Sequence, residues 1–393
     1  MKFAHLGDCH LGSWRQPELQ ELNFKSFEAA VEKCIKEGVE FILIAGDLFD
    51  SAYPPIEILK RTFGEFRKLK EAGIKCFMIA GSHDYSVSGK TFLDVLEKGG
   101  FCEICKYKET EEAVYLEPIK YKNFEIFGYP GKKSGLELES IKKIILPKET
   151  NNFRILMLHT ALTEAINNLP IESISMKYLP HADYYALSHL HINFEQKLND
   201  KPIIYSGPIF PNSFQELEDL CYGRFYIVQV EGYWEWKKIP LPLKEVISIN
   251  VEIENALTGT QKIISELKKY NLRGKIILLR LYGTIKQGTN ADINYEKIKS
   301  YLNEQGVYSF LKNTAKLQSK EEELEVKIPT SEMGKIEESL IEEYIKKTPD
   351  KFNHLIIPLI HSLDLQKQED EKTAIYETRL LSDLNKILNL DLK

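Results

Sequence analysis

The chain has 393 residues, of which 43% are hydrophobic and 28% are charged, and its formal net charge is −6. This length predicts two or three domains, and the composition is typical of globular proteins. The net charge argues against binding nucleic acid by global charge alone, but leaves a local basic groove or recognition through metal ions open. No apolar run reaches the roughly 18 residues of a membrane helix, and His5, Asp8 and His10 interrupt the N-terminus, unlike a signal peptide. We therefore expect a cytoplasmic protein without membrane contact.

The six cysteines are scattered along the chain, and only Cys102 and Cys105 form a CxxC pair. A zinc site would need a second pair or nearby histidines, and neither follows in the sequence. We therefore expect ordinary reduced thiols and assign no role to Cys102 and Cys105.

The first part of the chain alternates short β-rich runs with amphipathic stretches. It predicts strands at residues 3–6, 40–44 and 75–79, and helices at 23–37 and 56–72. This alternation is typical of a sheet with helices on its faces. In layered α/β folds, active sites gather in the loops at strand ends, so motifs at those positions are informative.

From about Tyr115 strands prevail, at residues 113–117, 124–129, 155–159, 184–188, 203–206 and 225–230. These strands would complete a sandwich of two sheets that ends near Leu243, where Pro240 and Pro242 mark a boundary. The fold class that we expect is therefore α/β, a two-sheet sandwich flanked by helices, and its domain spans residues 1–243.

Residues 244–318 predict a small α/β capping domain. Its strands are expected at 246–253, 275–282 and 307–311, and its helices at 260–270 and 295–305. The acidic run Glu321–Glu325 follows, in a helical tail of residues 319–393. The last helix, Thr373–Leu390, places apolar residues four apart on one stripe, which fits either docking on its own chain or binding a partner.

Four motifs carry carboxylates and imidazoles at the ends of the predicted strands. They are Asp8-Cys9-His10, Gly46-Asp47-Leu48-Phe49-Asp50, Gly81-Ser82-His83-Asp84, and His159 followed by Ser188-His189-Leu190-His191. Mn²⁺ prefers such a mixture of oxygen and nitrogen ligands. In extended backbone, residues two apart point the same way, so each pair can face one region. A carboxylate such as Asp47 can bridge two ions about 3.5–4 Å apart.

Each motif is weak by itself, because a lone DxH or HxH is more often a polar turn. His5, His181, His354 and His361 have no motif partner, and we leave them out of the site. The combination is what indicates a metal centre, since five of the nine histidines fall at strand ends beside these aspartates.

These motifs, in this order over roughly residues 1–230, resemble the pattern DxH, GDxxD, GNHD/E, H and GHxH of the calcineurin-like metallophosphoesterase superfamily. The stretch GDLFDSAYPP at 46–55 and Gly73-Ile74-Lys75 are similar to one family within it, as are Tyr205-Ser206-Gly207-Pro208 and Gly223-Arg224-Phe225. That family is the nuclease subunit of double-strand-break repair, called SbcD in bacteria, with archaeal and eukaryotic counterparts. The α/β module resembles its capping domain, and the tail resembles the segment that grips the partner ATPase.

The resemblance implies two divalent ions, most commonly Mn²⁺, at a dinuclear site. The ligands of the first ion would be Asp8, His10, Asp47 and His191. Asp47 would bridge to a second ion held by His159 and His189, with Ser82 in the position of the family's asparagine.

The resemblance also implies catalytic roles for His83 and Asp50. His83 would donate to the leaving or non-bridging oxygen of the phosphate, and Asp50 would hold that imidazole in its donor form. Two residues depart from the family pattern. Ser82 replaces the asparagine whose amide oxygen ligates the second ion, and Ser188 replaces the glycine of GHxH.

The function that we expect is a Mn²⁺-dependent DNA exonuclease or endonuclease that acts in double-strand-break repair with an SMC-like, coiled-coil ABC ATPase. One alternative is a small-molecule or nucleotide phosphodiesterase of the same superfamily, although such an enzyme needs neither cap nor tail. Another is a DNA-end-binding scaffold with weak activity, which only Ser82 favours. The sequence leaves the polarity of cleavage, the DNA-contacting residues and the physiological metal open.

We also expect a homodimer. Helix 56–72 carries Ile56, Leu59, Phe63 and Phe66 at helical spacing, and Phe92, Leu93 and Leu96 follow the third motif. Periodicity alone favours burial of these residues in the domain's own core. The repair-nuclease family instead uses helices at these positions for a two-fold dimer, to which a self-complementary apolar patch is suited.

Overall fold

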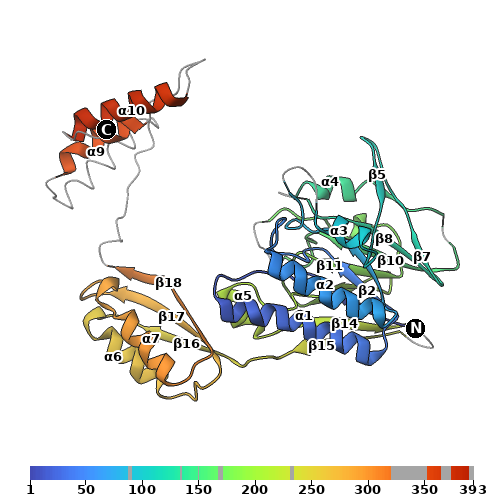
Figure 1. Cartoon of the computed structure of the whole chain (residues 1–393), viewed down its shortest axis with the longest axis horizontal. Coiled ribbons are helices and arrows are strands. Elements are labelled where there is room, and N and C mark those ends of the chain that lie inside the picture. The colour runs from blue at the N-terminus through green and yellow to red at the C-terminus, as the bar shows by residue number, and fades with distance from the viewer. Residues whose placement is uncertain are drawn as a thin grey trace. The chain divides into compact units, whose positions relative to one another are not determined.

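The structure is a computed structural model that describes residues 1–86, 91–132, 135–148, 150–166, 171–230, 234–319, 352–363 and 373–388. The acidic run Glu321–Glu325 lies outside these residues. The chain divides into two compact units, Met1–Ser319 and Lys320–Lys393 (Figure 1). Within the described part of the chain, no helix has the length and apolar character needed to cross a membrane.

The first sheet of the larger unit has six strands in the order β15-β14-β1-β2-β3-β4. Strands β1 to β4 are parallel neighbours, whereas β14 and β15 continue the sheet in antiparallel pairing. The strands are β1 (Lys2–Leu6), β2 (Phe41–Ala45), β3 (Lys75–Ile79), β4 (Glu103–Ile104), β14 (Gly223–Gln229) and β15 (Glu235–Leu241).

The second sheet also has six strands, in the order β12-β13-β11-β10-β8-β7. Its four central strands are parallel, and β7 and β12 pair antiparallel at the two edges. The strands are β7 (Ile119–Tyr121), β8 (Phe124–Tyr129), β10 (Phe153–His159), β11 (Tyr184–Ser188), β12 (Phe194–Leu198) and β13 (Lys201–Tyr205). A small third sheet contains β5 (Tyr107–Glu109), β6 (Val114–Leu116) and β9 (Ile144–Ile145).

The alternation of side chains along each strand explains the sandwich. In β2, Phe41 and Leu43 pack in the core between the two sheets, while Ile42 and Ile44 pack in the core that includes residues of α1 and α2. Successive side chains of a strand point to opposite faces, so a strand that is apolar throughout must be covered on both sides. The helices of this domain are α1 (Pro17–Glu37), α2 (Ile56–Glu71), α3 (Leu93–Lys98), α4 (Glu137–Ile141) and α5 (Phe214–Leu220).

Some boundaries differ from those expected from the sequence. Helix α1 begins at Pro17 rather than Asn23, because proline fits the first turn, where its missing N–H costs nothing. Strand β15 continues through Pro240, which we expected to mark a boundary. It is an edge strand of the sheet, where a residue without a donor is tolerated.

The capping module is a parallel sheet of β16 (Val246–Glu252), β17 (Ile276–Ile285) and β18 (Ser309–Ser319) with helices α6 (Ala256–Leu267) and α7 (Tyr295–Glu304). One face of this sheet packs with the two helices around Val251, Ile263 and Leu279. On the other face, Ile276 and Leu278 pack in a cluster with Leu19 of α1 and Leu217 of α5. The capping sheet is therefore joined to the two-sheet sandwich by an apolar contact.

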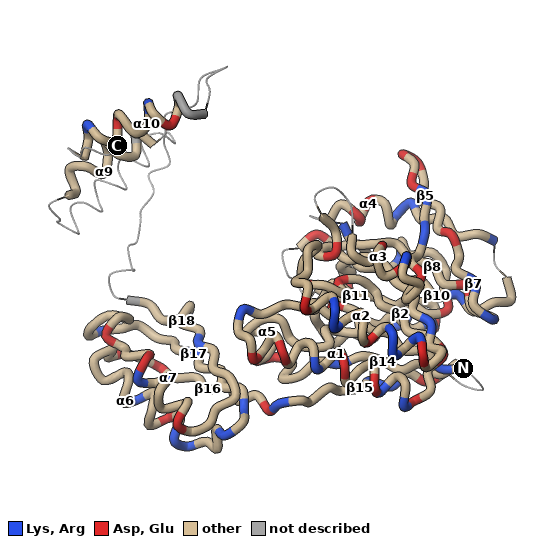
Figure 2. The backbone as a smooth tube through the Cα atoms, in the orientation of Figure 1, with Lys and Arg blue, Asp and Glu red and all other residues tan. Residues whose placement is uncertain are grey.

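The smaller unit contains α9 (Ile356–Leu363) and α10 (Thr373–Leu388). The expected α/β sandwich, α/β cap and helical tail are confirmed as the fold class, whereas the exact domain boundaries stay a prediction. Figure 2 shows that basic and acidic residues are intermixed along the sandwich and the cap rather than segregated. This pattern agrees with the expectation that any nucleic-acid contact would depend on a local site.

Candidate metal centre

The predicted motifs lie at the carboxyl ends of parallel neighbours. Strands β1, β2 and β3 are adjacent and parallel, as are β10 and β11 in the other sheet. Backbone hydrogen bonds join the first two motif loops, from Asp8 N to the Gly46 carbonyl at 3.1 Å and from His10 N to the Asp47 carbonyl at 3.0 Å. The chain topology therefore brings motifs that are far apart in sequence to one edge of the sandwich.

The backbone is strained where these loops carry their polar side chains. Asp8, His10, Asp47 and His189 have φ angles of 48°, 43°, 51° and 100°. Such positive angles cost side chains of L-residues on the order of 1–3 kcal/mol each, and they concentrate at functional sites where packing fixes them. Four of the nine described non-glycine residues with positive φ are thus predicted site residues.

Two motif glycines allow the loops to approach closely. A Cβ at Gly81 would lie 2.2 Å from Oδ1 of Asp47, and one at Gly46 would lie 2.4 Å from Nδ1 of His159. Any larger residue at either position would displace a carboxylate or an imidazole of the site. These glycines are thus required by packing against the candidate ligands.

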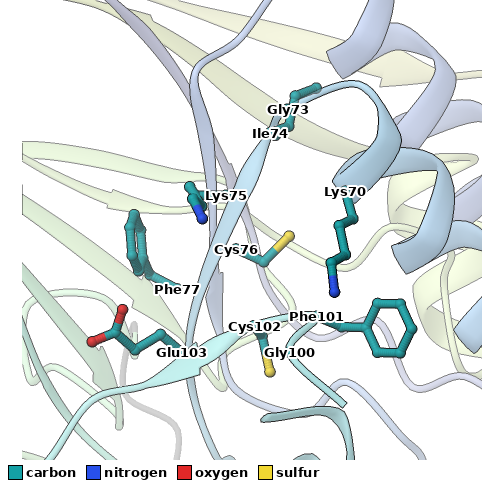
Figure 3. A pocket seen from close by; sticks show the side chains of 10 residues that line it. All are labelled: Lys70, Gly73, Ile74, Lys75, Cys76, Phe77, Gly100, Phe101, Cys102 and Glu103. Carbon is teal, nitrogen blue, oxygen red and sulfur yellow. The ribbon is translucent and has the colours of Figure 1, made fainter. Parts of the chain in front are cut away.

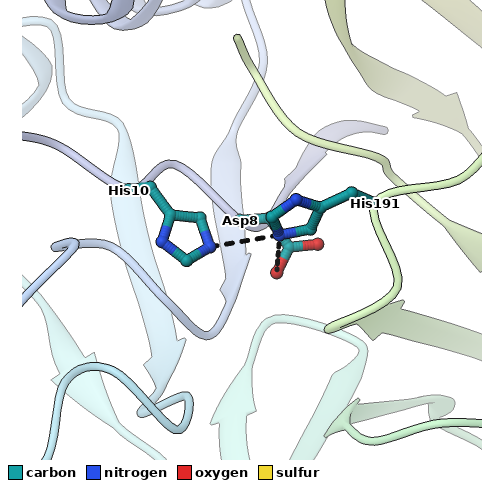
Figure 4. A group of neighbouring side chains, drawn as sticks. All are labelled: Asp8, His10 and His191. Atoms are coloured by element: carbon teal, nitrogen blue, oxygen red, sulfur yellow. Dashed lines mark hydrogen bonds and ion pairs between the residues drawn. The ribbon is translucent and has the colours of Figure 1, made fainter. Parts of the chain in front are cut away.

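The first group of candidate ligands is Asp8, His10 and His191 (Figure 4). Nε2 of His10 lies 3.1 Å from Nε2 of His191, which is 3.8 Å from Oδ1 of Asp8. The Asp8 carboxylate is fixed by the backbone N–H of His189, 3.0 Å from Oδ1. Asp8 is also buried, at 0% exposure.

The second nitrogens of the same two imidazoles face carboxylates. Nδ1 of His10 is 3.1 Å from Oδ1 of Asp50, and Nδ1 of His191 is 3.0 Å from Oε2 of Glu216. A proton on each Nδ1 satisfies both carboxylates and leaves the two Nε2 lone pairs facing each other. An added proton or a cation between them relieves that repulsion, so the residues present fit a divalent ion.

Asp47 occupies the position between the two histidine pairs. Its Oδ2 is 3.6 Å from Nε2 of His10 and 3.2 Å from Nε2 of His159. Although burial raises the pKa of Asp47, the charge and hydrogen bond of His159 outweigh it and hold that pKa well below its usual range. A single carboxylate oxygen within reach of both groups fits the bridging role that the resemblance implies.

Two further groups could hold an ion: one is His10, Asp50 and His83, and the other is Asp8, Asp47 and His159. His189 lies close to the latter group. Nδ1 of His159 is 3.1 Å from the Ala45 carbonyl, to which it can donate, and this leaves Nε2 3.3 Å from Nδ1 of His189. Burial lowers the pKa of His159, but Asp47 outweighs it and raises the value to about 9. Burial and the neighbouring charge of His159 lower the pKa of His189 to about 4.

His83 and Asp50 lie in contact with each other beside the candidate ligands. Nδ1 of His83 is 2.9 Å from the backbone carbonyl of Asp50, whereas the Asp50 carboxylate contacts His10. Asp50 therefore contacts the His83 imidazole through its peptide carbonyl, and the catalytic roles of both residues stay predictions. The His83 side chain is exposed, as a donor to an incoming phosphate must be.

Ser82 lies in the loop between Gly81 and His83, whose backbone N–H donates to Oδ1 of Asp47 at 2.8 Å. The loop therefore runs directly beside the bridging carboxylate, and a ligand role for Ser82 stays a prediction. The other departure, Ser188, is buried against Gly7, where a Cβ would lie 2.3 Å from its Oγ. This serine fills space that a glycine there would leave open.

Two positioning residues were missed. The sequence assigned no role to Asp84. Its carboxylate accepts hydrogen bonds from the backbone N–H of Gly81 at 2.9 Å and of Phe49 at 3.1 Å, and so joins the loop after β2 to the loop after β3. Burial, with the charge of Asp47, raises the pKa of Asp84 to about 7. Glu216 contacts His191, and the only sequence signal was the capping pattern that it forms with Ser213.

The residues set aside as structural lie elsewhere. His5 is buried and its Nδ1 is 3.0 Å from the Tyr184 hydroxyl. All six cysteines are free, and Cys102 and Cys105 pack in different cores. A pocket of about 170 Å³ beside Cys76 and Cys102 (Figure 3) is lined by none of the predicted site residues.

Comparison with known proteins identifies the class of this domain. Residues 1–193 match the model of the family described as calcineurin-like phosphoesterase. They include every predicted site residue. Residues 1–193 are thus similar to the calcineurin-like phosphoesterases, a fold that implies a dinuclear divalent metal site, and the candidate ligand groups lie within this stretch.

Over more of its length, the chain is similar to archaeal proteins named DNA double-strand break repair protein Mre11. The relative from Methanocaldococcus jannaschii is 28% identical over 286 residues, covering 68% of this chain and 74% of that protein. The relative from Archaeoglobus fulgidus is 24% identical over 302 residues, covering 70% and 67%. The relative from Sulfolobus acidocaldarius is 23% identical over 385 residues, covering 94% and 97%.

Proposed function

We propose that this protein is a Mn²⁺-dependent DNA nuclease that hydrolyses phosphodiesters at a dinuclear site and acts in double-strand-break repair. The observation that carries the proposal is the position of the Asp47 carboxylate between two imidazole pairs at the ends of parallel strands. The similarity to proteins named for double-strand break repair supports DNA as the substrate.

In this proposal Asp8, His10, Asp47 and His191 hold one ion, and Asp47, His159, His189 and Ser82 hold the other. When bound, the two ions would supply a hydroxide near neutral pH and neutralise charge on the phosphate. The chain's own contribution is positional. The Asp50 carbonyl accepts a hydrogen bond from Nδ1–H of His83. The imidazolium form of this side chain would then carry a second proton on Nε2, which it could donate toward the phosphate or the departing oxygen.

We further propose that the tail binds an SMC-like ABC ATPase. Helix α10 carries Tyr376, Leu380, Leu384 and Leu388 at intervals of four residues, the spacing with which an amphipathic helix enters a partner's groove. The alignment with the relative from S. acidocaldarius covers 94% of this chain and 97% of that protein. Removal of the chain after Ser319 should then abolish binding to the ATPase and spare cleavage of simple substrates.

We also propose a homodimer, with a smaller contact set than expected. Phe66, Leu93 and Leu96 are 0% exposed. Because they are buried in the domain's own core, they are not available for a dimer interface. Ile56 at the start of α2 and Val95 in α3 are 79% and 48% exposed, and they support a symmetric apolar contact. A monomer in light scattering at high micromolar concentration would contradict this.

The decisive experiment is a cleavage assay on duplex DNA, single-stranded DNA and a small phosphodiester, with Mn²⁺ or Mg²⁺, with and without the ATPase. We expect Mn²⁺-dependent DNA cleavage that exceeds cleavage of the small substrate. Efficient turnover of the small phosphodiester without DNA cleavage would favour the small-molecule alternative. DNA binding without any metal-dependent cleavage would favour the scaffold.

A further inference from the structure

Helix α5 contacts the metal centre with one side chain and the capping sheet with the next ones. Glu216 faces His191, with Oε2 3.0 Å from Nδ1 of that imidazole. Its neighbours Leu217 and Glu218 contact the capping module. The three residues are consecutive in a helix of only seven residues. A displacement of the helix by the capping module therefore also displaces Glu216.

The contact with the cap is specific and polar. The guanidinium of Arg280, on β17, donates to Oε2 of Glu218 at 2.5 Å and to the Gln215 side chain at 2.9 Å. Ser248 of β16 adds a hydrogen bond to Oε1 of Glu218 at 2.6 Å. The side chains of Arg280 and Glu218 are only 11% and 18% exposed, so solvent screens this pair less than a surface pair.

The apolar contact beside it is fully buried. Leu217 is 0% exposed and belongs to one cluster with Ile276 and Leu278 of the capping sheet. Deforming such a packed contact is costly, so the helix follows the sheet rather than moving independently. The capping sheet therefore fixes the position of α5 through two adjacent residues, Leu217 and Glu218.

The contact with the metal centre is equally defined. Oε2 of Glu216 also accepts from the backbone N–H of Asn212 at 2.9 Å, and the Ser213 hydroxyl donates to Oε1 at 3.2 Å. The carboxylate thus has one fixed orientation, and His191 is held with Nδ1 as donor and Nε2 toward Asp8 and His10. Outer partners of this kind set both the tautomer and the orientation of an imidazole ligand.

We infer that Glu216 is the positioning residue of His191 and that α5 couples it to the capping module through the Glu218–Arg280 pair. The affinity of the first ion then depends on the placement of a sheet that contributes no ligand to it. This inference rests on the proposed dinuclear site and adds to it a route by which the cap controls the site. The coupling is reciprocal, so ion binding also stabilises the docked cap.

The test is Mn²⁺ binding by calorimetry on the full chain, with variants at Glu216 on α5 and at Arg280 on β17. Glu216→Ala should weaken the first ion by roughly 10–100-fold, and Arg280→Met by roughly tenfold. Glu216→Gln, which keeps an acceptor for Nδ1, should restore most of the affinity. The matched control is Lys286→Met, which breaks an exposed pair of the cap with Glu254 that does not involve α5, and it should bind like the wild type.

The double variant separates coupling from general damage. If α5 is the route, Arg280→Met should add little once Glu216→Ala is present, and the charge swap Glu218→Arg with Arg280→Glu should recover affinity that Arg280→Met loses. Wild-type affinity in a folded Arg280→Met variant, or full additivity in the double variant, would overturn the inference. A wild-type chain that binds no divalent ion would instead overturn the proposed function.

Discussion

Two buried histidines of the same sandwich behave in opposite ways. His5, the penultimate residue of β1, and His159, the last residue of β10, are 0% and 1% exposed. Burial lowers the pKa of His5 to about 3, whereas Asp47 outweighs burial and raises the pKa of His159 to about 9. The difference shows that burial alone makes a histidine neutral and inert. A carboxylate at the strand end makes it a candidate ligand.

The largest effect on the cleavage rate is expected for His83→Ala, at the edge of the sandwich where the motif strands end. The imidazole is exposed and held by the Asp50 carbonyl, and the two proposed ligand sets do not include it. Cleavage should therefore fall by roughly 10²-fold or more, the usual contribution of a proton donor, while both ions stay bound. The measurement is a DNA cleavage assay combined with the metal content of the purified variant. A wild-type rate would remove His83 from the mechanism.

The raised pKa values predict that ion binding releases protons. His159 and His191, both with a pKa of about 9 in the folded protein, are protonated below that pH and must become neutral to bind an ion. Mn²⁺ affinity should rise with pH up to about 9, by at most roughly tenfold per pH unit for each proton released. Without metal, the stabilisation by these ion pairs is complete below pH 6.5, the unfolded value, and is lost as the pH rises through 9.

Calorimetry in buffers with different ionisation enthalpies counts the protons directly. His5 gives the matched contrast, because its lowered pKa keeps it neutral across this range. Binding of Mn²⁺ without proton release at pH 7 would show that the imidazoles are already neutral, which would contradict the difference between the two regions.

Ser82→Asn tests how complete the second ion's ligand set is. A neutral hydroxyl on a short side chain is a modest ligand, so the wild type should show one tight and one weak Mn²⁺ site. The asparagine should lower the Mn²⁺ concentration for half-maximal cleavage by roughly tenfold. Two equally tight sites in the wild-type protein would show that water already fills the position.

Asp50→Asn separates the two functions of this residue. The backbone carbonyl that holds His83 is unchanged, while the carboxylate beside Nδ1 of His10 loses its charge. Mn²⁺ affinity should fall by up to about tenfold, and the rate at saturating Mn²⁺ should be kept. A rate loss at saturation as large as that of His83→Ala would return the catalytic role to the carboxylate.

The smallest effect on cleavage is expected for His5→Phe. The substitution removes the hydrogen bond to Tyr184 and keeps an aromatic ring in the core between the sheets. Unfolding free energy should fall by about 1–2 kcal/mol, because a buried hydroxyl loses its partner. Thermal denaturation measures this loss, and the rate of DNA cleavage serves as its control. A loss of metal binding in this variant would contradict the contrast between His5, within a strand, and His159, at the end of one.

The sequence by itself determined the sandwich, the cap and the helical tail, because apolar runs with period two and amphipathic helices specify buried faces without reference to distant residues. It also selected Asp8, His10, Asp47, His159, His189 and His191, since ligand pairs at strand ends are a local pattern. Edge strands such as β12 and β15 were not expected, because their alternation is weak and their pairing is decided by a neighbouring strand.

Only the tertiary structure decided which groups orient the candidate ligands. Glu216 lies 25 residues beyond His191 in sequence, and the two are joined by the close approach of α5 to the loop after β11. Asp84 reaches the backbone of Phe49 across 35 residues. The Asp50 carbonyl, rather than its carboxylate, holds His83 because of how the loop after β2 turns. Such contacts follow from loop geometry and long-range packing, and residue types at fixed spacing carry no information about either.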